Sequence, residues 1–277
     1  MATLDLRPSP IVGTWYEGDP DNLANAIDAY LNNVKLPKLE GEVIAVIAPH
    51  AGHRYSGPVA AHAFAVLRGL KPALVAVISP FHNLANYPLL TTAHRAYSTP
   101  LGEIEVDQAA LHELQSALDV PITAIQKDRE HSLEIELPFL QRVLTNEFKL
   151  LPVMVRAQES RVAEQLGQAL AAILKNKPAV MVASTDLSHF YDQQTASILD
   201  HEMLKRIESL KPETIFEAER SGRGFACGHA AVAAVLWAGL ELGAHKVITL
   251  NYATSGDVTG DHSSVVGYGA AVVLKPL

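Results

Sequence analysis

The sequence is poor in cysteine and in basic residues, and both shortages limit what the protein can be. Cys227 is the only cysteine among 277 residues, which excludes a disulfide bond within the chain and is typical of a reducing compartment. The chain has 22 Lys and Arg against 30 Asp and Glu, so its formal net charge is −8 at pH 7. Nucleic-acid binding requires a basic face that neutralises phosphates, and this composition argues against one. We therefore expect no nucleic-acid partner.

Long hydrophobic segments are also missing. The longest apolar stretches, such as VIAVIA at 43–48 and AAVAAVLWAGL at 230–240, are too short or too rich in Ala and Gly to span a bilayer. The opening residues, MATLDLRPSP, contain no apolar core of the kind found in secretory signals. We therefore expect a cytoplasmic protein that does not contact membranes.

Apolar residues are nonetheless abundant, at 48% of the chain, and they gather in runs of strand length. Runs that are rich in β-branched residues and almost continuously hydrophobic are typical of strands buried on both faces of a parallel sheet. Segments with a helical pattern lie between these runs. The expected strands are Val43–Ala48, Ala73–Ser79, Leu150–Val155, Ala179–Ser184 and Lys246–Asn251, and the expected helices are Pro58–Leu70, Asp107–Leu118, Leu133–Leu144, Ser160–Lys175, Asp192–Leu210 and His229–Leu242.

This alternation of strands and helices predicts an α/β fold of three layers, with helices on both faces of a mostly parallel central sheet. The segment from Pro88 to Val106 is expected to add antiparallel strands, and the last run, 263–275, is expected to be one more strand. No low-complexity linker and no shift in composition divides the chain. A single domain over residues 1–277 is the interpretation that follows.

Polar residues suited to catalysis follow the best strand candidates. His50 follows the first strand, His82 follows the second, and Asp186 and His189 follow Ala179–Ser184. Ligands of open α/β sheets bind outside the carboxyl ends of the strands, so we expect these residues to converge on one cleft. A histidine at one strand end is often only a polar loop residue, but its recurrence at several strand ends favours a shared site.

Cys227 lies in the glycine-rich segment GRGFACGH (222–229), before an apolar helix. A lone cysteine is most often a small buried hydrophobic residue. Its place near a helix N-terminus favours the thiolate form, which points towards function. One thiolate and two imidazoles would make a three-ligand metal site with open positions for water or substrate. The residues alone leave both interpretations open.

A second group of polar residues is Glu130-His131-Ser132-Leu133-Glu134. On a helix, His131 and Glu134 would lie three residues apart on one side. Ser132 would serve as a helix N-cap. This structural role explains the serine, but it does not explain His131. The histidine therefore stays a candidate for the site.

These motifs resemble those of the Memo family (mediator of cell motility), whose prokaryotic members are called protein B of the AmmeMemoRadiSam system. The resemblance runs nearly end to end, and its strength comes from the number and order of the matches. The matching segments are Gly13-Thr14-Trp15-Tyr16, Ala48-Pro49-His50-Ala51-Gly52, Ser79-Pro80-Phe81-His82, Glu130-His131-Ser132-Leu133-Glu134, Leu137-Pro138-Phe139, Ser184-Thr185-Asp186-Leu187-Ser188-His189, Cys227-Gly228 and Asn251-Tyr252-Ala253-Thr254-Ser255-Gly256-Asp257.

The Memo family shares its fold with class III (LigB-type) extradiol dioxygenases, whose non-haem iron is bound by two histidines and one glutamate. The resemblance implies that His50 and His82 are the imidazole ligands and that Cys227 takes the place of the carboxylate. One departure is Phe81, which stands where family members usually have a small or polar residue and is expected to narrow the pocket. The residues implied to act in catalysis are His189, as acid and base, with Asp186 and His131 lining the site.

The implied activity is that of a non-haem iron(II) dioxygenase-like oxidoreductase acting on a small molecule such as an aromatic diol. His189, with an ordinary imidazole pKa of roughly 6.5, suits the removal of a proton from a substrate hydroxyl. Iron(II) is the expected ion, although a thiolate also suits copper and zinc. The family further implies a functional link to AMMECR-type and radical-SAM proteins.

Two other functions fit the same residues. A zinc-dependent hydrolase would use Glu134 or Asp186 to activate a metal-bound water. A non-catalytic module would bind a peptide or partner in the same cleft, as is thought for animal Memo and phosphotyrosine-containing receptor segments. Arg54, Arg129 and Arg223 are the only candidates for binding phosphate there, so the sequence favours this last function least.

Overall fold

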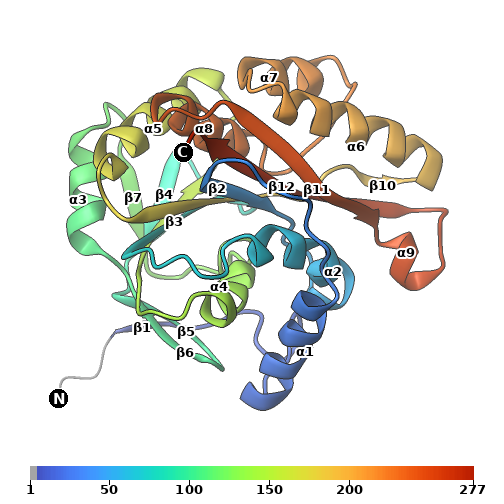
Figure 1. Cartoon of the computed structure of the whole chain (residues 1–277). Helices are drawn as coiled ribbons and strands as arrows, with labels where there is room; N and C mark the ends of the chain where they lie inside the picture. Colours follow the sequence, from blue (N-terminus) through green and yellow to red (C-terminus); the bar gives the residue numbers. More distant parts are fainter. Residues whose placement is uncertain (1–4) are drawn as a thin grey trace.

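The computed structural model describes residues 5–277, and a mixed nine-stranded sheet runs through its centre (Figure 1). Its strands are β2 (Glu42–Ala48), β3 (Leu74–Pro80), β4 (Leu89–Thr92), β7 (Ile122–Ile125), β8 (Lys149–Val155), β9 (Ala179–Ser184), β10 (His189–Tyr191), β11 (Lys246–Thr254) and β12 (Val265–Lys275). Strands β2, β9, β3 and β8 lie side by side in that order and are all parallel. On one side β4 joins β8 antiparallel and β7 joins β4 parallel. On the other side β12 joins β2 antiparallel, and both β10 and β11 pair with β12.

The parallel strands are buried on both faces, which explains their almost continuous apolar runs. In β3, for example, Leu74, Ala76 and Ile78 belong to one hydrophobic core, whereas Val75 and Val77 belong to another. Alternate side chains of a strand point to opposite faces, so each strand contributes to both cores. The α/β fold class with a mostly parallel centre is therefore confirmed.

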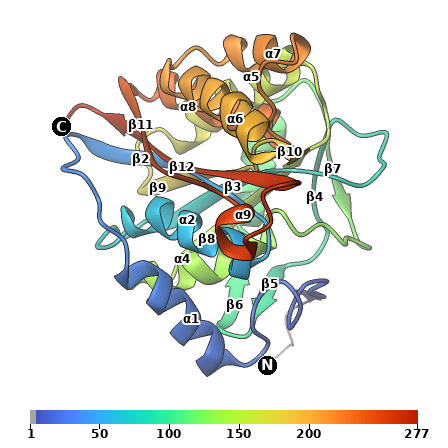
Figure 2. The same ribbon diagram turned by 90° about the vertical axis from the view of Figure 1, so that its right-hand side faces the viewer.

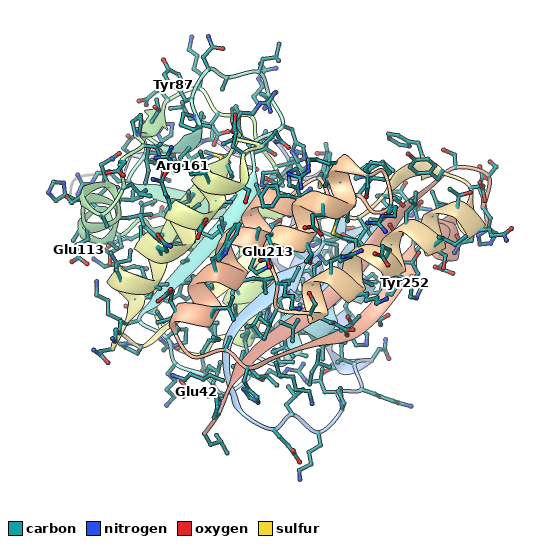
Figure 3. The ribbon with its side chains drawn as sticks, turned by 90° about the horizontal axis from the view of Figure 1, so that it is seen from above. Glu42, Tyr87, Glu113, Arg161, Glu213 and Tyr252 are labelled. Carbon is teal, nitrogen blue, oxygen red and sulfur yellow. The ribbon has the colours of Figure 1, made fainter. Side chains whose placement is uncertain are left out.

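Helices cover both faces of the sheet (Figure 2). The helices of one face pack in the hydrophobic core that contains Leu74, Ala76 and Ile78. Figure 3 shows this layer of helices from above, with Arg161 on α5 and Glu213 on α7. The helices of the opposite face pack in the core that contains Val75 and Val77. The first group is α3 (Gln108–Ser116), α5 (Ser160–Leu174), α6 (Gln193–Glu208), α7 (Glu213–Arg220) and α8 (His229–Glu241), and the second is α1 (Pro20–Asn32), α2 (His53–Ala65) and α4 (Leu137–Val143).

The expected antiparallel additions between Pro88 and Val106 are present but belong to two sheets. Strand β4 joins the main sheet, whereas β5 (Ala96–Thr99) and β6 (Gly102–Glu105) form an antiparallel pair. This pair joins β1 (Leu6–Arg7) in a separate three-stranded sheet.

Two expected helices differ from those in the structure. The helix expected at Pro58–Leu70 begins earlier, at His53, whose N–H donates to the Trp15 carbonyl at 2.8 Å. That contact joins distant parts of the chain, so local patterning does not reveal it. The helix expected at Leu133–Leu144 is a 3-10 turn, η1 (Glu134–Glu136), followed by α4. The break coincides with Pro138, which lacks the N–H needed to continue the earlier turn.

Within residues 5–277, no helix combines the length and the apolar character needed to cross a bilayer. The first four residues of the expected domain 1–277 lie outside the described residues.

Candidate metal centre

The parallel strands end at one edge of the sheet, and this edge carries the predicted site. His50 comes two residues after β2, His82 two residues after β3 and Asp186 two residues after β9. In Figure 3, Tyr87, in the loop that follows β3, lies at the opposite end of the molecule from Glu42, where β2 begins. Because the parallel strands end at the same edge, residues far apart in sequence lie close together there, as the general rule for open α/β sheets predicts.

Three histidines meet at this edge. His50, His82 and His131 each offer one ring nitrogen, and these nitrogens lie within 4.8 Å of one another. The rings of His82 and His131 are stacked, with centroids 4.9 Å apart and planes 7° from parallel. Nitrogen donors at this spacing can share one metal ion. The structure therefore brings His50 and His82 together as expected, and it adds His131 to the group of possible ligands.

Glu130 orients two of the three imidazoles. The backbone N–H of His82 donates to Glu130 Oε2 at 2.6 Å, and His82 Nδ1 lies 2.8 Å from Oε1. His131 Nδ1 lies 3.3 Å from the same oxygen. An ionised carboxylate can only accept, so His82 Nδ1 carries the hydrogen and Nε2 keeps its lone pair for an ion. A carboxylate behind a ligating histidine is a common way of fixing the ring and raising its basicity.

His50 is held by the end of β9. Its backbone N–H donates to Asp186 Oδ1 at 2.8 Å, and the N–H of Ala51 donates to the same oxygen at 3.3 Å. The His50 ring is buried, and its Nδ1 lies 2.8 Å from the Ser184 hydroxyl. Asp186 thus joins the turn after β2 to the turn after β9, while it also lines the cavity described below.

Burial keeps two of the imidazoles neutral. It lowers the pKa of His50 well below the ordinary value, with the nearby His82 and His131 acting in the same direction. It also lowers the pKa of His131 to about 4, against the opposing charge of Glu130. Burial alone would raise the pKa of Glu130, but hydrogen bonds from His82 bring this pKa well below its usual range. At neutral pH, His50 and His131 are therefore neutral, the form that binds metals, and they lie beside an ionised carboxylate.

The three imidazoles open into a cavity of about 400 Å³, large enough for a small aromatic molecule. The Trp15 ring lies 4.2 Å from the His131 ring, and Tyr55 also lines the wall. Phe81 is buried and is not part of the lining, so the expected narrowing by its ring does not occur. The lining residues are Thr14, Trp15, His50, Ala51, Gly52, Tyr55, His82, His131, Asp186, His189 and Val266.

His189 faces the same cavity from β10. The register of β10 against β12 shifts between His189 and Tyr191, and the intervening Phe190 has a left-handed φ of 65°. Such a bulge re-aims neighbouring side chains. His189 Nδ1 lies 2.9 Å from the Leu187 carbonyl, which can only accept, so Nδ1 carries the hydrogen and Nε2 has a free lone pair. Burial lowers the pKa of His189, so at neutral pH this nitrogen is ready to accept a proton.

Cys227 contacts the site from its other side. Its Sγ lies 3.1 Å from His50 Nε2 and accepts the Asp186 N–H at 3.3 Å. A side chain at Gly228 would collide with the Ser184 carbonyl, so glycine is needed for this loop to approach β9. Burial raises the pKa of the Cys227 thiol, with the nearby Asp186 acting in the same direction.

Cys227 is not one of the three mutually close candidate ligands, although it is half-buried beside His50. It lines a second cavity, of about 340 Å³, rather than the one into which the histidines open. His189 lines both cavities and so lies between them. The assignment of Cys227 as the third ligand stays a prediction.

Glu134 lies outside the site. Its carboxyl group accepts hydrogen bonds from Arg7, from Ser9 and from the Tyr16 hydroxyl, the last at 2.7 Å. It is buried in this network and does not line the histidine cavity. Ser132 does not cap the following turn, because its hydroxyl donates to the Pro80 carbonyl at 2.6 Å.

The supporting side chains were missed by sequence reasoning. The sequence presents Glu130 only as a neighbour of His131, and Ser184 only as part of the motif Ser184-Thr185-Asp186-Leu187-Ser188-His189. The useful signal was the pair Glu130-His131, because a carboxylate next to a candidate ligand often orients it. Ser184 carries no such signal, since its partners come from distant parts of the chain.

Comparisons with known proteins show the family to which the chain belongs. Residues 7–272 match the family described as Memo-like protein. A MEMO1 family protein of Nitrosopumilus maritimus is 34% identical over 271 residues, which covers 96% of this chain and 98% of the relative. A MEMO1 family protein of Methanothermobacter thermautotrophicus is 35% identical over 276 residues, which covers 95% of this chain and 98% of the relative.

The fold also resembles that of a solved structure with little sequence similarity. An uncharacterized protein from Escherichia coli K12 superposes with a TM-score of 0.52 at 13% identity, covering 83% of this chain and all of that protein. This likeness supports the architecture alone. The Memo fold in turn resembles that of class III extradiol dioxygenases. The chain belongs to the Memo family, and the three histidines at its sheet edge form its candidate metal centre.

Proposed function

We propose that this protein is a non-haem iron(II) oxidoreductase of the dioxygenase type, acting on a small aromatic diol. The observation that carries the proposal is the group of three imidazoles, His50, His82 and His131, which line one cavity together with His189. The cavity size suits one aromatic ring, and Trp15 and Tyr55 supply an apolar wall for it.

The donor set fits a divalent first-row metal. Imidazole nitrogen suits iron, zinc and copper, and the oriented Nε2 atom of His82 faces away from its carboxylate partner. Cys227 fits as a further, anionic donor. Ligands at roughly 2.1 Å and 2.3 Å that meet at a right angle lie about 3.1 Å apart. His50 Nε2 and Cys227 Sγ have this separation, 3.1 Å.

Iron(II), when bound, would supply a Lewis acid and a means of activating oxygen. The chain's own contribution is to bind and orient the substrate and to move one proton. His189 Nε2 accepts the proton of the hydroxyl that enters the site, because Leu187 already occupies Nδ1. Trp15 and Tyr55 limit water around the ring, and the ionised Glu130 holds His82 and His131 in place.

A hydrolytic function remains as an alternative, because Asp186 lines the same cavity and could act on a metal-bound water. Against it, one Asp186 oxygen already accepts two backbone N–H groups, which gives the residue a structural duty. Peptide binding through phosphate finds less support. Arg54, Arg129 and Arg223 are exposed, and none of them lines the cavity.

The test is oxygen uptake by protein loaded with iron(II) without oxygen and then given 4-nitrocatechol or related catechols in air. We expect uptake that depends on iron and on the catechol, and none from zinc-loaded protein. His189→Gln should retain the metal and lose uptake, whereas His112→Gln, at an exposed position on α3, serves as the matched control. Ester hydrolysis by zinc-loaded protein without any oxygen uptake would replace this proposal with the hydrolase.

A further inference from the structure

The Ser184 hydroxyl lies at the centre of a buried hydrogen-bond cluster behind His50. Its Oγ lies 2.7 Å from the Ser132 carbonyl oxygen, 2.7 Å from Glu136 Oε1 and 2.8 Å from His50 Nδ1. Ser184 and Ser132 are fully buried, Glu136 is 1% exposed and His50 is 2% exposed. The proposed reaction gives no role to Ser184, Ser132 or Glu136.

The chemistry of the three partners decides where the hydrogens lie. A hydroxyl has one hydrogen to donate and can accept two hydrogen bonds. The Ser132 carbonyl can only accept, so at 2.7 Å it requires the hydrogen of Ser184. The other two partners must then donate. Glu136 Oε1 therefore carries a proton, and His50 Nδ1 carries the ring hydrogen.

The surroundings of Glu136 agree with a neutral carboxyl group. Among the described residues, Ser184 is the only hydrogen-bond partner of the Glu136 carboxyl group, and no basic side chain forms a salt bridge with that group. Burial raises its pKa well above the ordinary value, and the nearby Asp186 acts in the same direction. An unpaired buried carboxylate is costly, so protonation is the form that such a site favours.

We propose that Glu136 and Ser184 are positioning residues for His50: the protonated Glu136 donates to Ser184, Ser184 donates to the Ser132 carbonyl, and His50 is thereby held with its hydrogen on Nδ1. Nε2, the nitrogen next to Cys227, then has its lone pair free for an ion. The benefit of this arrangement, a free lone pair on His50 Nε2, rests on the proposed metal site. The hydrogen positions themselves are those of the metal-free protein and do not depend on metal binding.

The first test uses metal-free protein and does not depend on metal binding. ¹⁵N NMR of the histidine rings should show His50 with its hydrogen on Nδ1 in the wild type. Infrared difference spectra between the wild type and Glu136→Gln should show the carbonyl band of a protonated carboxylic acid at neutral pH. A wild-type His50 with its hydrogen on Nε2, or a difference spectrum that holds only carboxylate bands, would overturn the proposal.

The second test compares variants. Glu136→Gln retains a donor for Ser184, so the His50 spectrum and the affinity for Zn(II) should stay near those of the wild type. Ser184→Ala removes the acceptor of the Nδ1 hydrogen, so His50 should populate both tautomers and Zn(II) affinity should fall by about 10- to 100-fold. Ser79→Ala is the matched control, because Ser79 is a buried serine on β3 whose hydroxyl has no partner among the described residues.

The outcomes separate this proposal from the proposed function. If His50 changes tautomer in Ser184→Ala but no variant or wild type binds Zn(II), the positioning stands and the metal site fails. If Ser184→Ala leaves the His50 tautomer as it is in the wild type, the positioning roles are wrong whatever the metal does.

Discussion

The two ends of the segment from Glu130 to Glu136 support the same site with carboxyl groups in opposite states. Glu130 accepts four N–H groups from three neighbouring residues, which stabilise its ionised form. Among the described residues, the Glu136 carboxyl group has only the hydroxyl of Ser184 as a partner, and the nearby Asp186 acts to raise its pKa. Both glutamates are 1% exposed, so solvent exposure does not distinguish them. The number and kind of donors decide which buried carboxyl group is charged.

The two glutamates therefore support the candidate metal site in different ways. The charged Glu130 raises the basicity of His82 and places a negative charge beside the candidate metal site. The neutral Glu136 sets hydrogen positions around His50 without adding a second charge. One short stretch of chain thus orients two candidate ligands, His82 and His50, by two different means.

Glu130→Leu should have the largest effect, because it leaves four N–H groups without their acceptor. Each buried donor left unsatisfied costs about 1–3 kcal/mol, so the free energy of unfolding should fall by roughly 3 kcal/mol or more. Urea denaturation measures this loss. Glu136→Leu is the matched control and should cost less, since only one hydrogen bond is removed. Equal losses in the two variants would contradict the comparison.

Cobalt binding should separate the two candidates for the third ligand. His131→Ala should weaken Co(II) binding strongly, because it removes one of the three mutually close donors. Cys227→Ser should abolish the near-ultraviolet thiolate-to-cobalt absorption band if Cys227 also binds, since a hydroxyl stays protonated at neutral pH. Absence of that band in the wild type would remove Cys227 from the ligand set. Unchanged affinity in His131→Ala would remove His131 instead.

The two glutamates also predict opposite pH dependences of stability in metal-free protein. The folded-state pKa of Glu130 lies below its unfolded value of about 4.3, so its contribution is complete above that pH and is lost as the pH falls through the folded pKa. The folded-state pKa of Glu136 lies above its unfolded value, so the free energy of unfolding declines as the pH rises above about 4.3. Urea denaturation midpoints of the wild type and of the two variants, measured from acidic to neutral pH, should reveal the two dependences. Glu130→Gln should reduce the acid sensitivity, and Glu136→Gln should reduce the decline towards neutral pH.

The sequence was sufficient for the parts of the fold that depend on local pattern. The buried strand runs, such as Ala179–Ser184, follow from their continuous hydrophobicity, and the rule for strand ends places His50 and His82 at one edge. The supports of these histidines could not be predicted, because Glu130 and Ser184 act through contacts with distant residues. The sequence predicts His131 in the site. Its stacking on His82 could not be predicted, because the residues that follow it form the 3-10 turn η1 where the local pattern predicts a helix.

The smallest effect on stability is expected at Phe190, on the other side of the cavity. There a bulge in the backbone of β10, rather than a carboxyl group, orients His189. Phe190 has a φ of 65° and is 76% exposed, so its ring contributes little packing. Glycine would relieve a left-handed strain of about 1–2 kcal/mol but would lose conformational entropy of about 0.5–1 kcal/mol. Phe190→Gly should therefore raise the free energy of unfolding by up to about 1 kcal/mol, whereas Phe190→Val should lower it. A loss of stability in the glycine variant would show that the bulge is not strained.

The central claim, that one metal ion binds between the imidazoles, is tested most directly by anomalous diffraction from crystals grown with iron(II) in the absence of oxygen. The account predicts a single strong peak at roughly 2.0–2.3 Å from ring nitrogens of His50 and His82, with His131 or Cys227 completing the site. A peak elsewhere in the molecule, or no peak from protein that contains iron by elemental analysis, would contradict it.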